Sequence, residues 1–98
     1  MENVFVLEEM GENYSGYKKQ DRPKRSAFVF ITAVLDESGD ALEDLKKIDE
    51  VKEVYLARGA YDIVAKISGD SFDHLRENVV KRIQSLSSIK STLTLTVI

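Results

Sequence analysis

VKEVYLARGAYDIVAKIS, residues 51–68, is the segment from which the architecture of this chain can be worked out. Two runs rich in Val, Ile, Tyr and Leu, in which apolar and polar residues roughly alternate, flank a break at Arg58-Gly59-Ala60. Glycine can take the positive φ that tight hairpin turns require. The segment therefore predicts a β-hairpin with Tyr61 and Asp62 at the mouth of its turn, where an aromatic wall, a carboxylate and backbone donors could meet a small zwitterion.

The segments before the hairpin predict a strand and a helix. Residues 27–35, AFVFITAVL, are apolar at nearly every position, which is typical of a central strand with both faces covered. A polar break at 36–40 with candidate N-caps follows. Leu42, Leu45 and Ile48 then fall three apart, as on the buried stripe of a short amphipathic helix.

The segments after the hairpin predict a second helix and a last strand. Gly69-Asp70-Ser71 ends the hairpin and supplies an N-cap serine. The tail alternates strictly from Thr92, which predicts a strand with a threonine face and a leucine/valine face. The apolar positions of the helix between them are Phe72, Leu75, Val79, Ile83 and Leu86.

The order strand, helix, strand, strand, helix, strand predicts an α+β fold. We expect a ferredoxin-like βαββαβ sandwich, a four-stranded antiparallel sheet of order 4-1-3-2 with two helices on one face. Helices on one face leave the other apolar face of residues 27–35 bare, which predicts a sheet-to-sheet homodimer. Phe28, Phe30, Thr32 and Val34 share one face of this strand, and Val29, Ile31, Ala33 and Leu35 the other; the pattern does not tell which faces the helices. As dimer-interface residues we predict Phe28, Phe30 and Val34.

Composition limits the function classes. Hydrophobic residues at 43% and charged residues at 32% are typical of one soluble globular domain, and a net charge of −3 argues against nucleic-acid binding through overall charge. Cysteine is absent and histidine occurs once, so we expect no disulfide, no structural zinc and no metal or other cofactor. Because no apolar run is long enough to span a bilayer and the N-terminus lacks a signal-peptide pattern, we expect a cytoplasmic protein that does not contact membranes.

Residues 1–25 are predicted to be an N-terminal arm or linker without a helix-turn-helix, and residues 26–98 a separate domain. The arm joins an acidic part around Val4-Phe5-Val6-Leu7 to a basic run at 18–25 that contains the only proline. We favour a solvated tether over a phosphate contact for this run. Residues 4–7 could pair with a sheet edge.

From Ala27 to Ile98 the chain resembles the effector-binding (RAM) domain of the Lrp/AsnC, or feast/famine, family of transcriptional regulators. The resemblance rests on three motifs in order: LKKIDEVKEV at 45–54, GAYD at 59–62 and IKSTLT at 89–94. It implies a ferredoxin-like fold, dimers formed through the sheets, assembly into tetramers or octamers, and amino-acid effectors held where dimers meet. Because no helix-turn-helix pattern precedes the domain, the chain resembles a stand-alone module. We therefore expect no direct sequence-specific DNA binding, and a full-length family regulator becomes a candidate partner.

The resemblance also implies the effector-binding residues. Gly59 would shape the turn, Tyr61 would form a wall, and Asp62 would bind the ammonium group of the effector while turn amides face its carboxylate. Asp62 could instead cap the hairpin, although its backbone rather than its carboxylate should suffice there. Arg58 is equally suited to an interface salt bridge. The full predicted set is Arg58, Gly59, Ala60, Tyr61, Asp62, Ser91, Thr92 and Thr94.

Other functions on the same fold are less well supported. An RNA-recognition domain needs stacking aromatics on both central strands, and residues 62–68 have none. A dimeric α/β-barrel enzyme would need catalytic groups, but His74 falls off the apolar stripe of its helix and is expected to face solvent. We predict no catalytic residues and no enzyme activity. A purely structural module that co-assembles with a full-length regulator remains the alternative to an amino-acid sensor that modulates transcription or metabolism.

Overall fold

The computed structural model describes residues 24–97. The predictions for the arm up to residue 23 lie outside this range. Along the described part the strands are β1 (Arg25–Ala33), β2 (Val51–Leu56), β3 (Ile63–Gly69) and β4 (Ile89–Val97), with the helix α2 (Ser38–Lys46) between β1 and β2. A second helix, residues 72–84, consists of α3 (Phe72–His74), the π-helical turn η2 (Leu75–Val80) and α4 (Lys81–Gln84).

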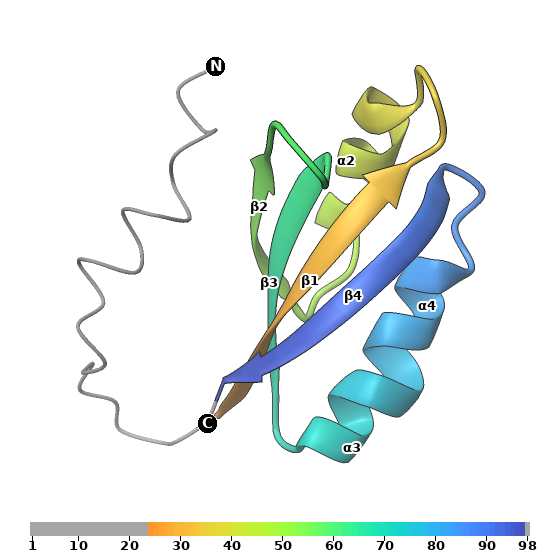
Figure 1. Cartoon of the computed structure of the whole chain (residues 1–98). Coiled ribbons are helices and arrows are strands. Elements are labelled where there is room, and N and C mark those ends of the chain that lie inside the picture. The colour runs from red at the N-terminus through yellow and green to blue at the C-terminus, as the bar shows by residue number, and fades with distance from the viewer. Residues whose placement is uncertain (1–23, 98) are drawn as a thin grey trace.

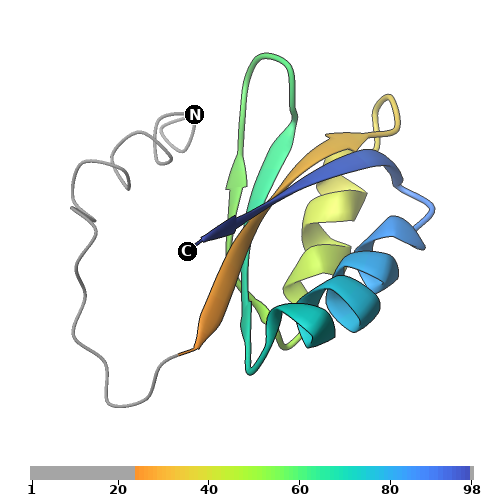
Figure 2. The ribbon, with the colours of Figure 1, turned by 60° about the horizontal axis from the view of Figure 1, so that its bottom comes forward.

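The four strands form one antiparallel sheet in the order β2-β3-β1-β4, which confirms the predicted order and the ferredoxin-like topology. The apolar strands β1 and β3 occupy the centre, as Figure 1 shows. Both helices lie on one side of the sheet (Figure 2), so no helix of residues 24–97 covers the other side. The predicted layers are thus those of the structure.

The helix-covered face of the sheet builds the core. Along β1, burial alternates strictly, and Val29 and Ile31 are fully enclosed beneath the helices. Branched and small side chains at these positions let the helices approach the strands closely. The cluster consists of Ala27, Val29, Ile31, Ala33, Ala41, Leu45, Ile48, Ile63, Ala65, Ile67, Leu75, Val79, Val80, Ile83 and Ile89.

Phe28 and Phe30 lie on the helix-free face, which resolves the ambiguity left by the sequence. The strand ends earlier than predicted. Leu35 and Val34 lie beyond the end of β1, and the Val34 N–H donates to the Ser88 carbonyl at 2.8 Å. The strand is therefore shorter than predicted and does not include Val34, whose place at a dimer interface stays a prediction. Leu35, predicted on the opposite strand face, is 85% exposed in the turn after the strand.

The two helices begin differently. Ser71 caps the second helix as predicted, because its Oγ accepts a hydrogen bond from the His74 N–H at 3.0 Å. At the start of α2, Glu37 occupies the N-cap position without a side-chain hydrogen bond, so the caps expected there do not form.

Gly69 is enclosed where β3 meets the second helix, and a Cβ at this position would lie 3.0 Å from Leu75 Cδ2. Only glycine allows this close approach without a shift of the leucine.

Candidate functional site

The loop between β2 and β3 is longer than the predicted tight turn and spans residues 57–62. It is closed at its base by a hydrogen bond of 2.8 Å from the Ala57 N–H to the Asp62 carbonyl. Gly59 has a φ of 126°, which confirms that the turn needs glycine. Arg58, Gly59 and Ala60 are exposed at the tip. The loop therefore presents polar backbone and one cation beyond the end of the sheet.

Asp62 ties this loop to the central strand with both its backbone and its side chain. Its N–H donates to the Ile31 carbonyl at 2.8 Å, and its Oδ2 accepts from the Ala33 N–H at 2.9 Å. The pairing of β1 with β3 ends at Ile63, the first residue of β3. The Asp62 carboxylate therefore supplies an acceptor beyond the end of the paired strands. The expectation that the fold needs only the backbone of Asp62 is therefore wrong.

Tyr61 lies against the helix-free face of the sheet. Its ring meets that of Phe30 edge to face, with centroids 5.5 Å apart and planes at 84°. Phe30 and Thr32, two residues further on, lie on the helix-free face of β1. Thr32 is paired with Ser91 of β4, and paired residues of antiparallel strands share a face. The structure therefore brings Tyr61 and Ser91 to the same face, near the same end of β1.

The two predicted threonines of β4 lie on the other face. Thr92 Oγ1 accepts a hydrogen bond of 2.9 Å from Gln84 of the second helix, and Thr94 is paired with the core residue Val29. Their side chains therefore point to the helix side of the sheet, away from Tyr61. Because an effector on the helix-free face would meet Ser91 but not Thr92 or Thr94, the predicted set divides into two groups.

Thr32 was placed on this face from the sequence but was not named as a site residue, and the register shift in β4 was not predicted. Thr32 pairs with Ser91 but Ala33 pairs with Ile89, so Lys90 is the extra residue of a β-bulge. The bulge lies beside Ala33, whose N–H binds Asp62. The alternation of Phe28, Phe30 and Thr32 was the signal that placed Thr32 on this face, whereas nothing local in the sequence marks the bulge.

The helix-free face also has a polar edge along β2. The Tyr55 hydroxyl donates to Glu53 Oε1, and partial burial together with this bond raises the pKa of Tyr55 to about 12. Glu53 of β2 is paired with Lys66 of β3. Further along the same face, the row of side chains that continues this pair onto β1 and β4 is apolar. Tyr55 is therefore a neutral hydrogen-bond donor, and the face changes from polar at β2 to apolar at β4.

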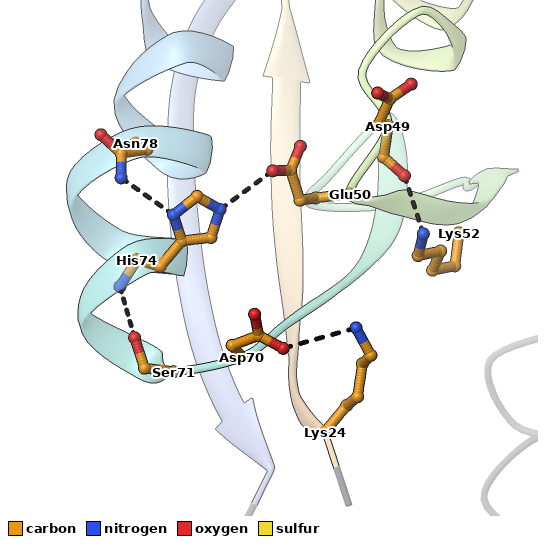
Figure 3. Close-up of polar contacts among 8 residues, drawn as sticks. All are labelled: Lys24, Asp49, Glu50, Lys52, Asp70, Ser71, His74 and Asn78. Carbon is orange, nitrogen blue, oxygen red and sulfur yellow. Dashed lines mark hydrogen bonds and ion pairs between the residues drawn. The ribbon is translucent and has the colours of Figure 1, made fainter. Parts of the chain in front are cut away.

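A second polar cluster lies at the opposite end of the sheet, where β2 begins (Figure 3). His74 Nε2 lies 2.9 Å from Glu50 Oε2, and His74 Nδ1 lies 3.0 Å from the amide nitrogen of Asn78. Since an amide nitrogen donates, Nδ1 accepts and Nε2 carries the proton that binds Glu50. This bond is the main reason that the pKa of Glu50 is lowered.

The expectation that His74 faces solvent is only partly right. Its side chain is 39% exposed and links the second helix to the turn before β2. Lys24 and Asp70 form an ion pair of 3.5 Å nearby.

Within residues 24–97 no three His, Cys, Asp or Glu side chains gather as metal ligands would. None of the helices described is long and apolar enough to cross a membrane.

The fold defines the class of this chain as a ferredoxin-like α+β domain, with a helix-free apolar face and a polar loop at one end of its sheet. The family model of the Lrp/AsnC ligand binding domain matches residues 26–98. The chain belongs to the Lrp/AsnC family, and the match covers the predicted effector domain.

Relatives agree with this assignment. The regulatory protein AsnC of Escherichia coli K12 is 38% identical over an alignment of 72 residues, and the match covers 70% of this chain and 47% of AsnC. The chain thus spans about half the length of this curated relative. The solved structure of Escherichia coli AsnC superposes with a TM-score of 0.72 at 29% identity and covers 94% of this chain and 67% of AsnC. A protein of Thermus thermophilus gives a TM-score of 0.70 at 30% identity and covers 76% of this chain and 92% of its own.

Proposed function

We propose that this chain is an effector-binding module that assembles through its helix-free sheet face and binds a small amino acid at the loop end of the sheet. In this role it modulates transcription or metabolism through partner proteins. Regulatory relatives and the ligand-binding family model support a regulatory role. The amino acid and the assembly rest on the side chains described below.

The proposed assembly surface is the apolar part of the helix-free face. Phe28 and Phe30 of β1 are paired with Leu95 and Leu93 of β4, so the four side chains form one surface. Leu93 and Leu95 are 53% and 57% exposed, although both are large and apolar. A second copy offers the same surface, and two sheets stacked face to face would bury it.

Charge at the centre of this surface tests the assembly. Leu93→Lys places an ammonium group in the proposed interface. Each copy also loses the free energy of burying the leucine side chain, about 1.5–3 kcal/mol. We expect a monomer by light scattering at micromolar concentration, whereas wild type is at least a dimer. Thr96→Lys, on the other face of the same strand, is the matched control. A wild-type monomer would contradict the proposal.

The proposed effector site is carried by one observation, the position of the Asp62 carboxylate beside Tyr61 at the end of the sheet. One carboxylate oxygen accepts from Ala33, but a carboxylate offers about four acceptor sites, so it can also bind an ammonium group. Tyr61 supplies an apolar wall, Ser91 a hydroxyl, and the loop 58–60 backbone donors for the effector carboxylate. Thr92 and Thr94 are not part of this proposal.

A thermal-shift screen with the twenty amino acids tests the site. A ligand at 100 times its Kd adds about 2.7 kcal/mol to the free energy of unfolding. For a domain of this size that corresponds to roughly 10–20 °C in Tm. A regulator of this fold from Neisseria meningitidis, 12% identical to this chain, has been solved in complex with L-Met, so methionine is included among the first ligands. Failure of every amino acid to raise Tm would refute the sensor proposal.

The second candidate is a structural module that co-assembles with a full-length family regulator. It is favoured by the family, because the regulator AsnC has a region similar to this domain and could offer a matching sheet face. Mixed sheet-face dimers with such a regulator, detected by native mass spectrometry without any added amino acid, would support it. An enzyme on this fold is less well supported, since His74 is bound on both sides by Glu50 and Asn78.

A further inference from the structure

The outer side of β2 is an open strand edge. β2 ends the order of the sheet, and no other strand of the described chain pairs with it on that side. The Ala57 N–H, directly after β2, points toward β3, because it donates to the Asp62 carbonyl at 2.8 Å. Backbone groups alternate in direction along a strand, so the N–H groups of Val54 and Leu56 point outward. An edge of this kind is a template on which another strand can pair.

The same edge leaves two apolar side chains half covered. Val54 and Leu56 are paired with Ala65 and Ile63 of β3, so they lie on the helix side of the sheet. Ala65 and Ile63 are fully buried, whereas Val54 and Leu56 are only partly buried, although both pack against the core. The difference arises because β3 has a strand on each side and β2 has one neighbour within the described sheet. A further strand would complete the cover of both side chains.

We propose that residues 4–7 of this chain, Val-Phe-Val-Leu, pair with the outer edge of β2 as a fifth, antiparallel strand. Their β-branched, aromatic and aliphatic side chains are typical of strands. Alternation would place two of them beside Val54 and Leu56 on the helix side, and the other two beside Tyr55 on the helix-free side. The proposal is independent of the effector site and of the sheet-face dimer, because it concerns the edge of one sheet.

The direction of the chain favours β2 over β4, the other edge strand. Arg25 at the start of β1 is paired with Gly69, and Val51 at the start of β2 with Ile67, so both strands begin at the same end of the sheet (Figure 1). A strand antiparallel to β2 finishes at that end, three strand spacings or roughly 14 Å from β1. Residues 8–23 can bridge this distance, since an extended chain rises about 3.3 Å per residue. A strand antiparallel to β4 would finish at the opposite end, and the chain would have to return along the whole sheet.

The charges near the start of β2 agree with this direction. Glu8 and Glu9 follow the apolar segment directly, so an antiparallel arrangement brings them to the end of the sheet where β2 begins. Lys46 and Lys47 end α2 at this place, and Lys52 lies in β2; all three are exposed. These lysines already contact neighbouring acceptors on the surface, but exposed contacts of this kind are weak enough to be exchanged. The acidic residues would therefore meet a basic surface.

Hydrogen exchange of the full chain, followed by NMR, tests the added strand. Of two adjacent residues in a strand, one donates toward the neighbouring strand, so Phe5→Pro/Val6→Pro removes that donor in either register. The two outward-facing amides of β2 should exchange at least roughly tenfold faster in this variant than in wild type. Asn13→Pro/Tyr14→Pro, outside the segment, is the matched control and should exchange like wild type. Equal exchange of these amides in wild type and Phe5→Pro/Val6→Pro would overturn the proposal.

Cysteine pairs test whether the added strand comes from the same chain. The sequence has no cysteine, so Val54→Cys can be combined with a second cysteine at each of residues 4–7 in turn. Mild oxidation should form disulfides within one chain at alternate positions, either 4 and 6 or 5 and 7. Equal linking at all four positions, no linking, or links formed only between copies would overturn the pairing of residues 4–7 with their own sheet. The sheet-face dimer and the effector site are unaffected by any of these results.

Discussion

Replacing Asp62 by asparagine and by alanine separates its part in the fold from its part in binding. Asparagine retains a side-chain oxygen that can accept from the Ala33 N–H, whereas alanine leaves that partly buried donor without its partner. An unpaired buried donor costs about 1–3 kcal/mol, and exchanging a charged for a neutral acceptor costs about 0.5–1 kcal/mol. We therefore expect Asp62→Ala to lower Tm by roughly 4–20 °C and Asp62→Asn by only a few degrees.

Binding should respond differently, because both variants lose the negative charge. A charge-assisted hydrogen bond to an ammonium group is worth about 1.5–3 kcal/mol. Its loss raises the Kd of an amino-acid effector roughly ten- to a hundredfold. Asp62→Asn should consequently bind almost as weakly as Asp62→Ala, although it is nearly as stable as wild type.

Titration calorimetry with the best ligand of the screen, at a temperature where all three proteins are folded, measures these affinities. Differential scanning calorimetry of the same samples gives the stabilities. If Asp62→Asn bound the effector as tightly as wild type, the carboxylate would serve only the Ala33 contact, and the ammonium site would have to lie elsewhere. Asp70→Asn, at the other end of the sheet, is the control for the loss of one charge.

Two further predictions concern stability. Gly69→Ala should lower the free energy of unfolding, measured in urea, by about 1–2 kcal/mol, because its Cβ would lie 3.0 Å from the buried Leu75. Gly39→Ala in α2, where a Cβ meets nothing within 4 Å, should raise the free energy of unfolding by about 0.5–1 kcal/mol. Equal effects of the two substitutions would contradict the packing argument. The folded pKa of Glu50 lies below its ordinary value of 4.5 because of the hydrogen bond to His74, so ionised Glu50 stabilises the fold above about pH 4.5 and this contribution is lost as pH falls through the lowered pKa. Glu50→Gln should therefore cost more stability at pH 6 than at pH 3, and a difference independent of pH would refute the assignment.

Local periodicity was enough to predict the elements and their order. Alternation along residues 51–68 and the spacing of Leu75, Val79 and Ile83 depend only on neighbours in sequence, and the structure places these residues as expected. The π-helical turn η2 was not predicted, because one extra residue per turn barely changes which positions face the sheet. Val80 is buried in addition to Val79 there.

Contacts between residues far apart in sequence explain what could not be predicted. The Asp62 bond to Ala33 joins residues 29 positions apart, and the Glu50 bond to His74 joins residues 24 apart. Neither partner carries a local signal for the other, so both side chains were expected in looser surroundings. Leu35 was assigned to the strand because its hydrophobicity continues the apolar run, whereas the chain has already turned there.

The division of β1 into two unlike faces connects the fold with the proposed function. The helix side carries Ala27 and Ala33 at its ends, where small side chains permit close packing, and the open side carries the two phenylalanines. A chain of 98 residues encloses a modest core, and within residues 24–97 nothing covers the phenylalanines and leucines of this sheet face, so a partner that buries them would add stability. The polar row at Glu53 and Tyr55 would then remain near the rim, where hydration is retained. The loop at 57–62 extends past the end of the sheet, so a partner stacked on the sheet face can leave Asp62 accessible to an effector.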